Sequence, residues 1–246
     1  MANWVNMSAM PFKIFVMGLS HVTALVRAWH ASSAAYPETR FVLLNDPAYQ
    51  PPLNEAGLHP AILTQLREAG AGLHVSLLGG NDHSMIGVVR HPQRFDFVLP
   101  AEPDLPLDEN VEIVPAGLLR QELSRRIAPH LEVLALYRRV VPGRVVHIES
   151  PPPLPTAHIQ AYPGIFQDLV AECGVSPPLL RYKLWQLHSA LYREACARLG
   201  VEFLPAPRET QDAQGIMLPH FCNPDPTHGN ARYGGHVLAK LLERSP

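Results

Sequence analysis

Short apolar runs of four to six residues alternate with helical patterns along most of the chain, and this alternation restricts the fold more than any other feature. The apolar runs span 12–17, 41–44, 74–78, 144–148 and 201–204. Helical patterns follow at 21–29, 60–69, 117–140, 180–199 and 229–243. Strands that alternate with helices are typical of a parallel sheet whose two faces are both covered by helices. The sequence therefore predicts an α/β sandwich of three layers around a mostly parallel five-stranded sheet.

Two stretches do not follow this alternation. They lie near 84–114, which holds an acidic loop rich in proline, and near 150–180, which is rich in proline and has scattered aromatic residues. No internal repeat or linker divides the 246 residues, and 47% apolar and 17% charged residues are typical of a folded domain. We therefore expect a single domain over 1–246, with both stretches as excursions at the carboxyl ends of the strands, where open α/β sheets bind ligands.

Charge and cysteine content narrow the class of protein. A formal net charge of −2 argues against a general nucleic-acid binder. Three cysteines are too few for a disulfide framework or a zinc cluster. The amino terminus lacks the basic start and long apolar stretch of a signal peptide, and no apolar run approaches the ~20 residues of a membrane span. We expect a cytoplasmic protein with neither a nucleic-acid nor a membrane partner.

Three polar segments follow predicted strands or precede the last helix. Ser20 comes after the first apolar run and Gly18, and the segment 79–82 (Gly-Gly-Asn-Asp) comes after the third. Asp225 and His228 lie three residues apart on a proline-containing loop just before the final helical pattern. An imidazole whose tautomer is set by a nearby carboxylate is the base that activates a serine nucleophile. The three segments thus each offer one piece of a hydrolase site.

The order of these segments resembles the SGNH, or GDSL-type, hydrolase superfamily of esterases and lipases. The resemblance extends from Gly18 to the last helix and implies a flavodoxin-like fold. It implies that Ser20 is the nucleophile, that His228 is the general base, and that Asp225 orients the imidazole. It also implies that the side-chain amide of Asn81 and the backbone N–H of Ser20 form an oxyanion hole.

The chain departs from the family pattern at three places. Leu19 stands where the family usually has an acidic residue. The glycine that completes the oxyanion hole is best matched by Gly57, with Gly70 and Gly72 as weaker candidates. His21 stands where many relatives have an apolar residue, and it could contact substrate or cap the helix start.

Each candidate residue also has a plainer interpretation. Ser20 could cap a helix, Asn81 could be a turn residue, and Asp225 could accept backbone N–H groups in a turn. Asp82 and His83 are candidate substrate contacts. Asp82 could instead hold its loop, and His83 could instead face solvent.

The function expected from these residues is hydrolysis of a carboxylic ester through an acyl-enzyme on Ser20. A small acyl group on a carbohydrate is the favoured substrate, because no long apolar lid segment suggests a lipid. No cofactor and no metal ligand are expected. The alternatives are an acyltransferase, a non-catalytic carbohydrate-binding protein, and a metal-dependent phosphoesterase. The last would take its metal ligands from the Asn, Asp and His of 81–83 together with His21 and His228.

Overall fold

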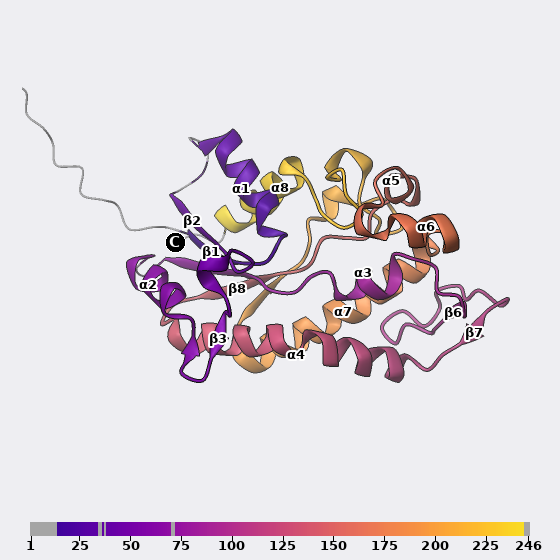
Figure 1. The fold of residues 1–246 in the computed structure, drawn as a ribbon, viewed down its shortest axis with the longest axis horizontal. Helices are drawn as coiled ribbons and strands as arrows, with labels where there is room; N and C mark the ends of the chain where they lie inside the picture. The colour runs from indigo at the N-terminus through magenta and orange to yellow at the C-terminus, as the bar shows by residue number, and fades with distance from the viewer. Residues whose placement is uncertain (1–13, 34–35, 37, 70–71, 244–246) are drawn as a thin grey trace, which may run out of the picture.

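The central sheet has five parallel strands in the order β2-β1-β5-β8-β9. The computed structural model describes residues 14–33, 36, 38–69 and 72–243 (Figure 1). The strands are β1 (Ile14–Gly18), β2 (Thr39–Leu43), β5 (Leu73–Leu77), β8 (Val145–Ile148) and β9 (Glu202–Leu204). The predicted flavodoxin-like sheet is thus confirmed. Residues 12 and 13 of the predicted run 12–17 lie outside the described part of the chain.

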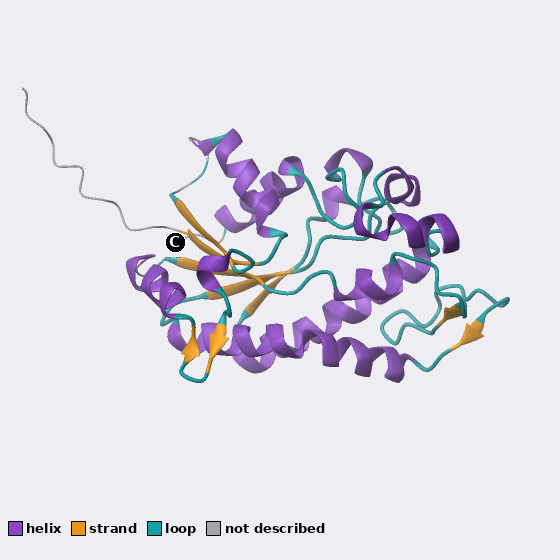
Figure 2. Ribbon diagram, viewed as in Figure 1, coloured by secondary structure: helices purple, strands orange, loops and turns teal. Residues whose placement is uncertain are grey.

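Helices cover both faces of the sheet, as the alternation predicted (Figure 2). One face carries α1 (Val22–Ala31) and α8 (Ala231–Leu242), and the other carries α2 (Pro60–Ala69) and α4 (Ala116–Val140). The carboxyl-terminal end of α7 (Pro178–Leu199) joins the second face.

The residues of β1 show how the two layers are filled. Ile14 and Val16 belong to the core beneath α1 and α8, while Phe15 and Met17 belong to the core beneath α2 and α4. Successive side chains of a strand point to opposite faces, so a strand covered on both sides is apolar at every position. All five residues of β1 are buried, which explains the unbroken apolar run in the sequence.

The first excursion, near 84–114, packs on the long helices where they extend past the sheet (Figure 1). It contains α3 (Asp82–Gly87) and the short paired strands β6 (Phe95–Asp96) and β7 (Glu112–Ile113). The ammonium group of Lys183 on α7 is buried and lies 2.9 Å from both carboxylate oxygens of Asp96. It also donates to the carbonyl of Pro106 at 2.8 Å. This ion pair therefore anchors the first excursion to α7.

The second excursion, near 150–180, contains α5 (Thr156–Ala161), η3 (Gly164–Phe166) and α6 (Gln167–Cys173). The buried guanidinium of Arg181 holds it by donating to the carbonyls of Leu154 and Ser176 and to the hydroxyl of Thr156. A buried guanidinium needs such acceptors, since an unpaired buried charge is costly.

The remaining elements are short. They are η2 (Pro47–Tyr49), β3 (Leu53–Asn54), β4 (Gly57–Leu58), η4 (Arg208–Thr210) and η5 (Pro219–Phe221). None of the described helices combines the length and apolar character that crossing a lipid bilayer requires.

Candidate active site

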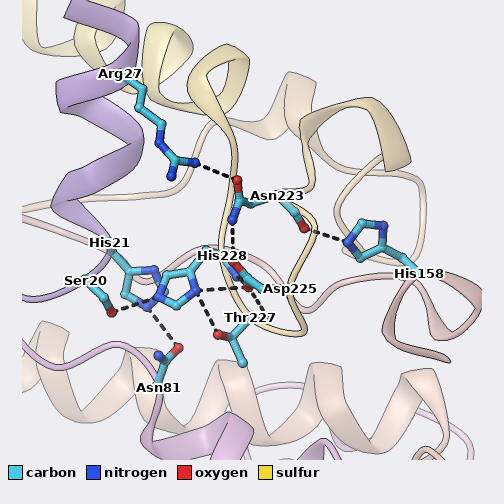
Figure 3. A network of polar contacts seen from close by, with 9 residues as sticks. All are labelled: Ser20, His21, Arg27, Asn81, His158, Asn223, Asp225, Thr227 and His228. Atoms are coloured by element: carbon cyan, nitrogen blue, oxygen red, sulfur yellow. Dashed lines mark hydrogen bonds and ion pairs between the residues drawn. The ribbon is translucent and has the colours of Figure 1, made fainter. Parts of the chain in front are cut away.

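Ser20, His228 and Asp225 form one chain of hydrogen bonds at the carboxyl end of β1 (Figure 3). The Oγ atom of Ser20 lies 2.7 Å from Nε2 of His228, and Nδ1 of His228 lies 3.0 Å from Oδ1 of Asp225. An ionised carboxylate only accepts hydrogen bonds, so the imidazole proton is on Nδ1. Nε2 is then free to accept the proton of the Ser20 hydroxyl. The fold thus brings together three residues that the sequence analysis selected.

Asp225 is surrounded by donors that keep it ionised. Its Oδ1 also accepts the backbone N–H groups of Thr227 at 2.9 Å and His228 at 2.8 Å, and its Oδ2 accepts the side-chain amide of Asn223. Burial alone would raise the pKa of Asp225, but the hydrogen bonds from His228, Asn223 and Thr227 outweigh burial and hold that pKa well below its usual range. The Asp225 carboxylate therefore does two things at once. It accepts backbone N–H groups within its own turn, and it accepts the hydrogen bond from His228 Nδ1 that orients the imidazole.

Asn223 is a part of the site that the sequence analysis missed. Its side-chain Oδ1 accepts from Arg27 on α1 at 2.8 Å, and its carbonyl accepts from Nε2 of His158 on α5 at 2.7 Å (Figure 3). The loop that carries Asp225 is therefore tied to two helices. The only local sign was the run Asn-Pro-Asp-Pro, which is typical of turns and does not identify the partner of the asparagine.

Asn81 lies on the loop between β5 and α3 (Figure 3). Its Oδ1 is 3.0 Å from Nε2 of His21. Within the described residues, neither its Nδ2 group nor the backbone N–H of Ser20 donates a hydrogen bond. Both donors are thus available to a ligand beside the Ser20 hydroxyl.

The loop before Asn81 requires its two glycines. Gly79 and Gly80 have φ angles of +72° and +113°, a region that side-chain-bearing residues rarely adopt. A Cβ atom on Gly80 would lie 2.5 Å from Cδ2 of His21, and one on Gly79 would lie 2.0 Å from the hydroxyl of Tyr192. The Gly-Gly pair therefore allows the loop to pass close enough to place Asn81.

The predicted completing glycine, Gly57, lies in the β3–β4 hairpin. It has a φ of +118°, and a Cβ atom added there would have no neighbour within 4 Å. Gly72 immediately precedes β5, and so lies at the edge of the sheet opposite to Ser20. Gly70 lies outside the described residues. The role of Gly57 stays a prediction.

The three candidate substrate contacts differ in burial. His21 and His83 are only 5% and 4% exposed, so little of either ring is open to a substrate, and the solvent-facing interpretation of His83 is wrong. Burial, together with the nearby His188 and His21, keeps the pKa of His83 well below its usual value. Asp82 is partly exposed, and its Oδ2 lies 3.9 Å from Nε2 of both His130 and His188, beyond hydrogen-bonding distance. Direct substrate contact by these residues stays a prediction.

The geometry around Ser20 corrects its plainer interpretation as a helix cap. The residue that caps α1 is His21, whose side chain makes no capping bond, and the Ser20 hydroxyl faces His228 instead. Leu19 stands at the position where the SGNH superfamily usually has an acidic residue. Its apolar side chain packs against the apolar core beneath α2 and α4. In the part of the chain that the structure describes, no three His, Cys, Asp or Glu residues are arranged to hold a metal ion.

Comparisons with known proteins identify the fold. No family model matches the chain, and no curated protein matches it. The structure resembles a Streptococcus pneumonia protein provisionally assigned as a platelet activating factor, with 14% identity over 97% of this chain and 86% of that chain and a TM-score of 0.50.

Two further solved structures show weaker similarity. The periplasmic domain of a lipopolysaccharide acetyltransferase from Salmonella ser. Paratyphi A has 12% identity over 96% of this chain and 84% of that chain, with a TM-score of 0.48. A GDSL-like lipase from Bacteroides thetaiotaomicron VPI-5482 has 13% identity over 94% of this chain and 86% of that chain, with a TM-score of 0.43. Identities this low establish the fold alone, and the predicted three-layer α/β fold is confirmed at that level.

Proposed function

We propose that this protein is a serine esterase of the SGNH type, which hydrolyses a carboxylic ester through an acyl-enzyme on Ser20. The observation that carries the proposal is the unbroken chain from Ser20 Oγ to His228 Nε2 at 2.7 Å and from His228 Nδ1 to Asp225 Oδ1 at 3.0 Å. A serine hydroxyl is a weak nucleophile at neutral pH and becomes reactive when a positioned base removes its proton. The chain supplies that base and the carboxylate that orients it.

In the first half of the reaction, Ser20 Oγ attacks the ester carbonyl and its proton passes to His228 Nε2. The Nδ1–H of the resulting imidazolium stays bonded to Asp225, whose negative charge stabilises it. The carbonyl oxygen becomes an oxyanion that accepts hydrogen bonds from Asn81 Nδ2 and from the backbone N–H of Ser20. When the tetrahedral intermediate collapses, the C–O bond to the alcohol breaks and His228 gives its proton to the departing oxygen.

In the second half, His228 removes a proton from a water molecule, which attacks the acyl-enzyme carbonyl. The same two donors stabilise the second oxyanion, and the bond to Ser20 Oγ breaks as His228 returns the proton to it. An alcohol in place of water would give a transesterified product by identical steps. The acceptor, and not the triad, therefore distinguishes a hydrolase from an acyltransferase.

Two hollows that border neighbours of the triad are small. One is lined by Thr227 and the other by His21; each has a volume of about 10 Å³, and neither is lined by Ser20, Asp225 or His228. A long acyl chain needs a far larger apolar cavity. Ser20 and His228 are themselves partly exposed, so the alcohol part of the substrate could lie in solvent. A small acyl group on a carbohydrate or similar polar alcohol is the substrate class that we propose.

The test is covalent labelling of Ser20. We expect a small fluorophosphonate to add once to the wild-type protein, as measured by intact mass, and not to add to Ser20→Ala. His228→Ala should lower the labelling rate without unfolding the protein, as checked by circular dichroism. Short-chain esters and acetylated sugars would then be screened, with and without an added sugar acceptor. Labelling of Ser20→Ala at the wild-type rate would contradict the proposed nucleophile.

A further inference from the structure

His21 is buried between the nucleophile and the proposed oxyanion-hole residue. Its Nε2 lies 3.0 Å from Asn81 Oδ1, and its ring lies against that of His228 with 4.6 Å between the centroids (Figure 3). Gly80 passes so close to the His21 ring that a Cβ atom there would lie 2.5 Å from Cδ2. The His21 ring is therefore in contact with Asn81, His228 and Gly80.

The hydrogen bond to Asn81 sets which end of the amide faces Ser20. An asparagine side chain accepts at Oδ1 and donates at Nδ2, and the two ends point in different directions. The Nδ1 atom of His21 is buried and has no partner in the described structure. A buried N–H without an acceptor is rarer and more costly than an unpaired acceptor, so the proton of His21 belongs on Nε2. His21 then donates to Asn81 Oδ1, which leaves Nδ2 for the site.

We propose that His21 is a positioning residue for the reaction, which holds the Asn81 amide so that Nδ2 points at the developing oxyanion. This inference rests on the proposed function of Ser20 and Asn81. An oxyanion hole stabilises the transition state only if its donors are already oriented. A free asparagine on a surface loop rotates about its side-chain bonds, whereas the Asn81 amide is bonded to a buried ring that packs against His228 and Gly80.

The charge of His21 matters as much as its orientation. His228 and Asp225 face it from the catalytic loop, and His188 faces it from α7. Burial first, and then the nearby His228, lowers the pKa of His21 to about 3. The ring is therefore neutral at every pH at which the triad could operate. A cation at this place would oppose the imidazolium that forms on His228 when it takes the serine proton.

A pair of substitutions at His21 separates the donor from the ring. His21→Leu fills much of the same volume without a donor, and His21→Gln carries an N–H₂ group at a position similar to that of Nε2. Removing an oxyanion donor costs roughly 10²–10³ in turnover, and misorienting it should cost about 10–10². We expect His21→Leu to lower kcat by that smaller factor with little change in KM, and His21→Gln to recover most of the loss.

A double substitution tests whether His21 acts through Asn81. In an Asn81→Ala background, His21→Leu should lower kcat by only about twofold or less, because the group that it positions is already absent. A direct substrate contact or a general packing role would lower kcat by the same factor in both backgrounds. Full multiplication of the two effects would overturn the proposal.

The tautomer of His21 gives a readout that is independent of activity. Two-bond ¹H–¹⁵N correlation spectra of ¹⁵N-histidine-labelled wild-type protein should show a neutral Nε2–H ring from pH 5 to pH 9, assigned by comparison with His21→Gln. A ring protonated on Nδ1 would overturn the proposal. If the wild-type protein proved inert to fluorophosphonate, the proposed function would fail, and the tautomer would still decide whether His21 orients Asn81.

Discussion

Replacing Asp225 with asparagine tests the electrostatic core of the proposed mechanism. The carboxylate accepts from His228 Nδ1 and two backbone N–H groups at Oδ1, and from Asn223 at Oδ2. An amide must place an N–H₂ group at one of these two positions, where only donors are present. The asparagine would keep its oxygen toward His228, and its N–H₂ group would then face the amide of Asn223. The geometry of the imidazole is thus roughly kept while its counter-charge is lost.

The size of the effect follows from the separation of the two charges. At 3.0 Å between Nδ1 and Oδ1, the Coulomb energy of the imidazolium and the carboxylate is about 5 kcal/mol at an effective dielectric constant of roughly 20. Both side chains are about one-quarter exposed, so solvent screening reduces this to roughly 3–5 kcal/mol. Each ~1.4 kcal/mol of transition-state stabilisation is worth a factor of ten in rate. We therefore expect kcat to fall by about 10²–10⁴.

The assay is steady-state hydrolysis of a short-chain p-nitrophenyl ester, with the rate of fluorophosphonate labelling as a second readout. Asn223→Ala is the matched control, because it removes one donor to Asp225 while leaving the charge, and it should cost about tenfold or less. Thermal unfolding by circular dichroism would show that both variants are folded. If Asp225→Asn retained activity within about fivefold of wild type, the carboxylate would not stabilise the imidazolium as argued here.

Three further predictions concern the supporting structure. Lys183→Met leaves the buried Asp96 carboxylate without its cation, so the free energy of unfolding measured in urea should fall by about 3–5 kcal/mol. The double variant with Asp96→Asn should recover much of this loss. Gly80→Ala puts a residue with a side chain at a positive φ, and its Cβ atom would press against His21. We expect the free energy of unfolding to fall by at least about 1–2 kcal/mol and kcat to fall as well. A wild-type melting temperature and a wild-type kcat would contradict this. Stability should also fall on acidification, because the unfolded state binds protons near pH 6.5 at histidines that burial keeps neutral in the folded state to far lower pH. These are His21, His83, His147 and His188. The loss begins below about pH 6.5 and amounts to at most about 1.4 kcal/mol per histidine per pH unit, so equal urea midpoints at pH 7 and pH 5.5 would refute it.

The sequence by itself determined the layers of the fold and the polar segments at the edge of the sheet. The predicted helix 60–69 has the observed limits, and the predicted third strand 74–78 is displaced by one residue from β5. These predictions succeeded because strand and helix periodicity record burial locally, residue by residue. The three polar segments were recognisable for a related reason, since they directly follow strands or directly precede a helix.

Only the tertiary structure decided which side chains meet. Ser20 and His228 are separated by 208 positions, and their contact depends on the parallel register of the sheet and on the packing of α1 against α8. The attachment of Asn223 to Arg27 and the burial of His21 against Asn81 likewise join segments distant in sequence. Nothing in the pattern around His21 distinguishes a substrate contact from a buried donor. That distinction depends on neighbours contributed by other loops, which local periodicity does not record.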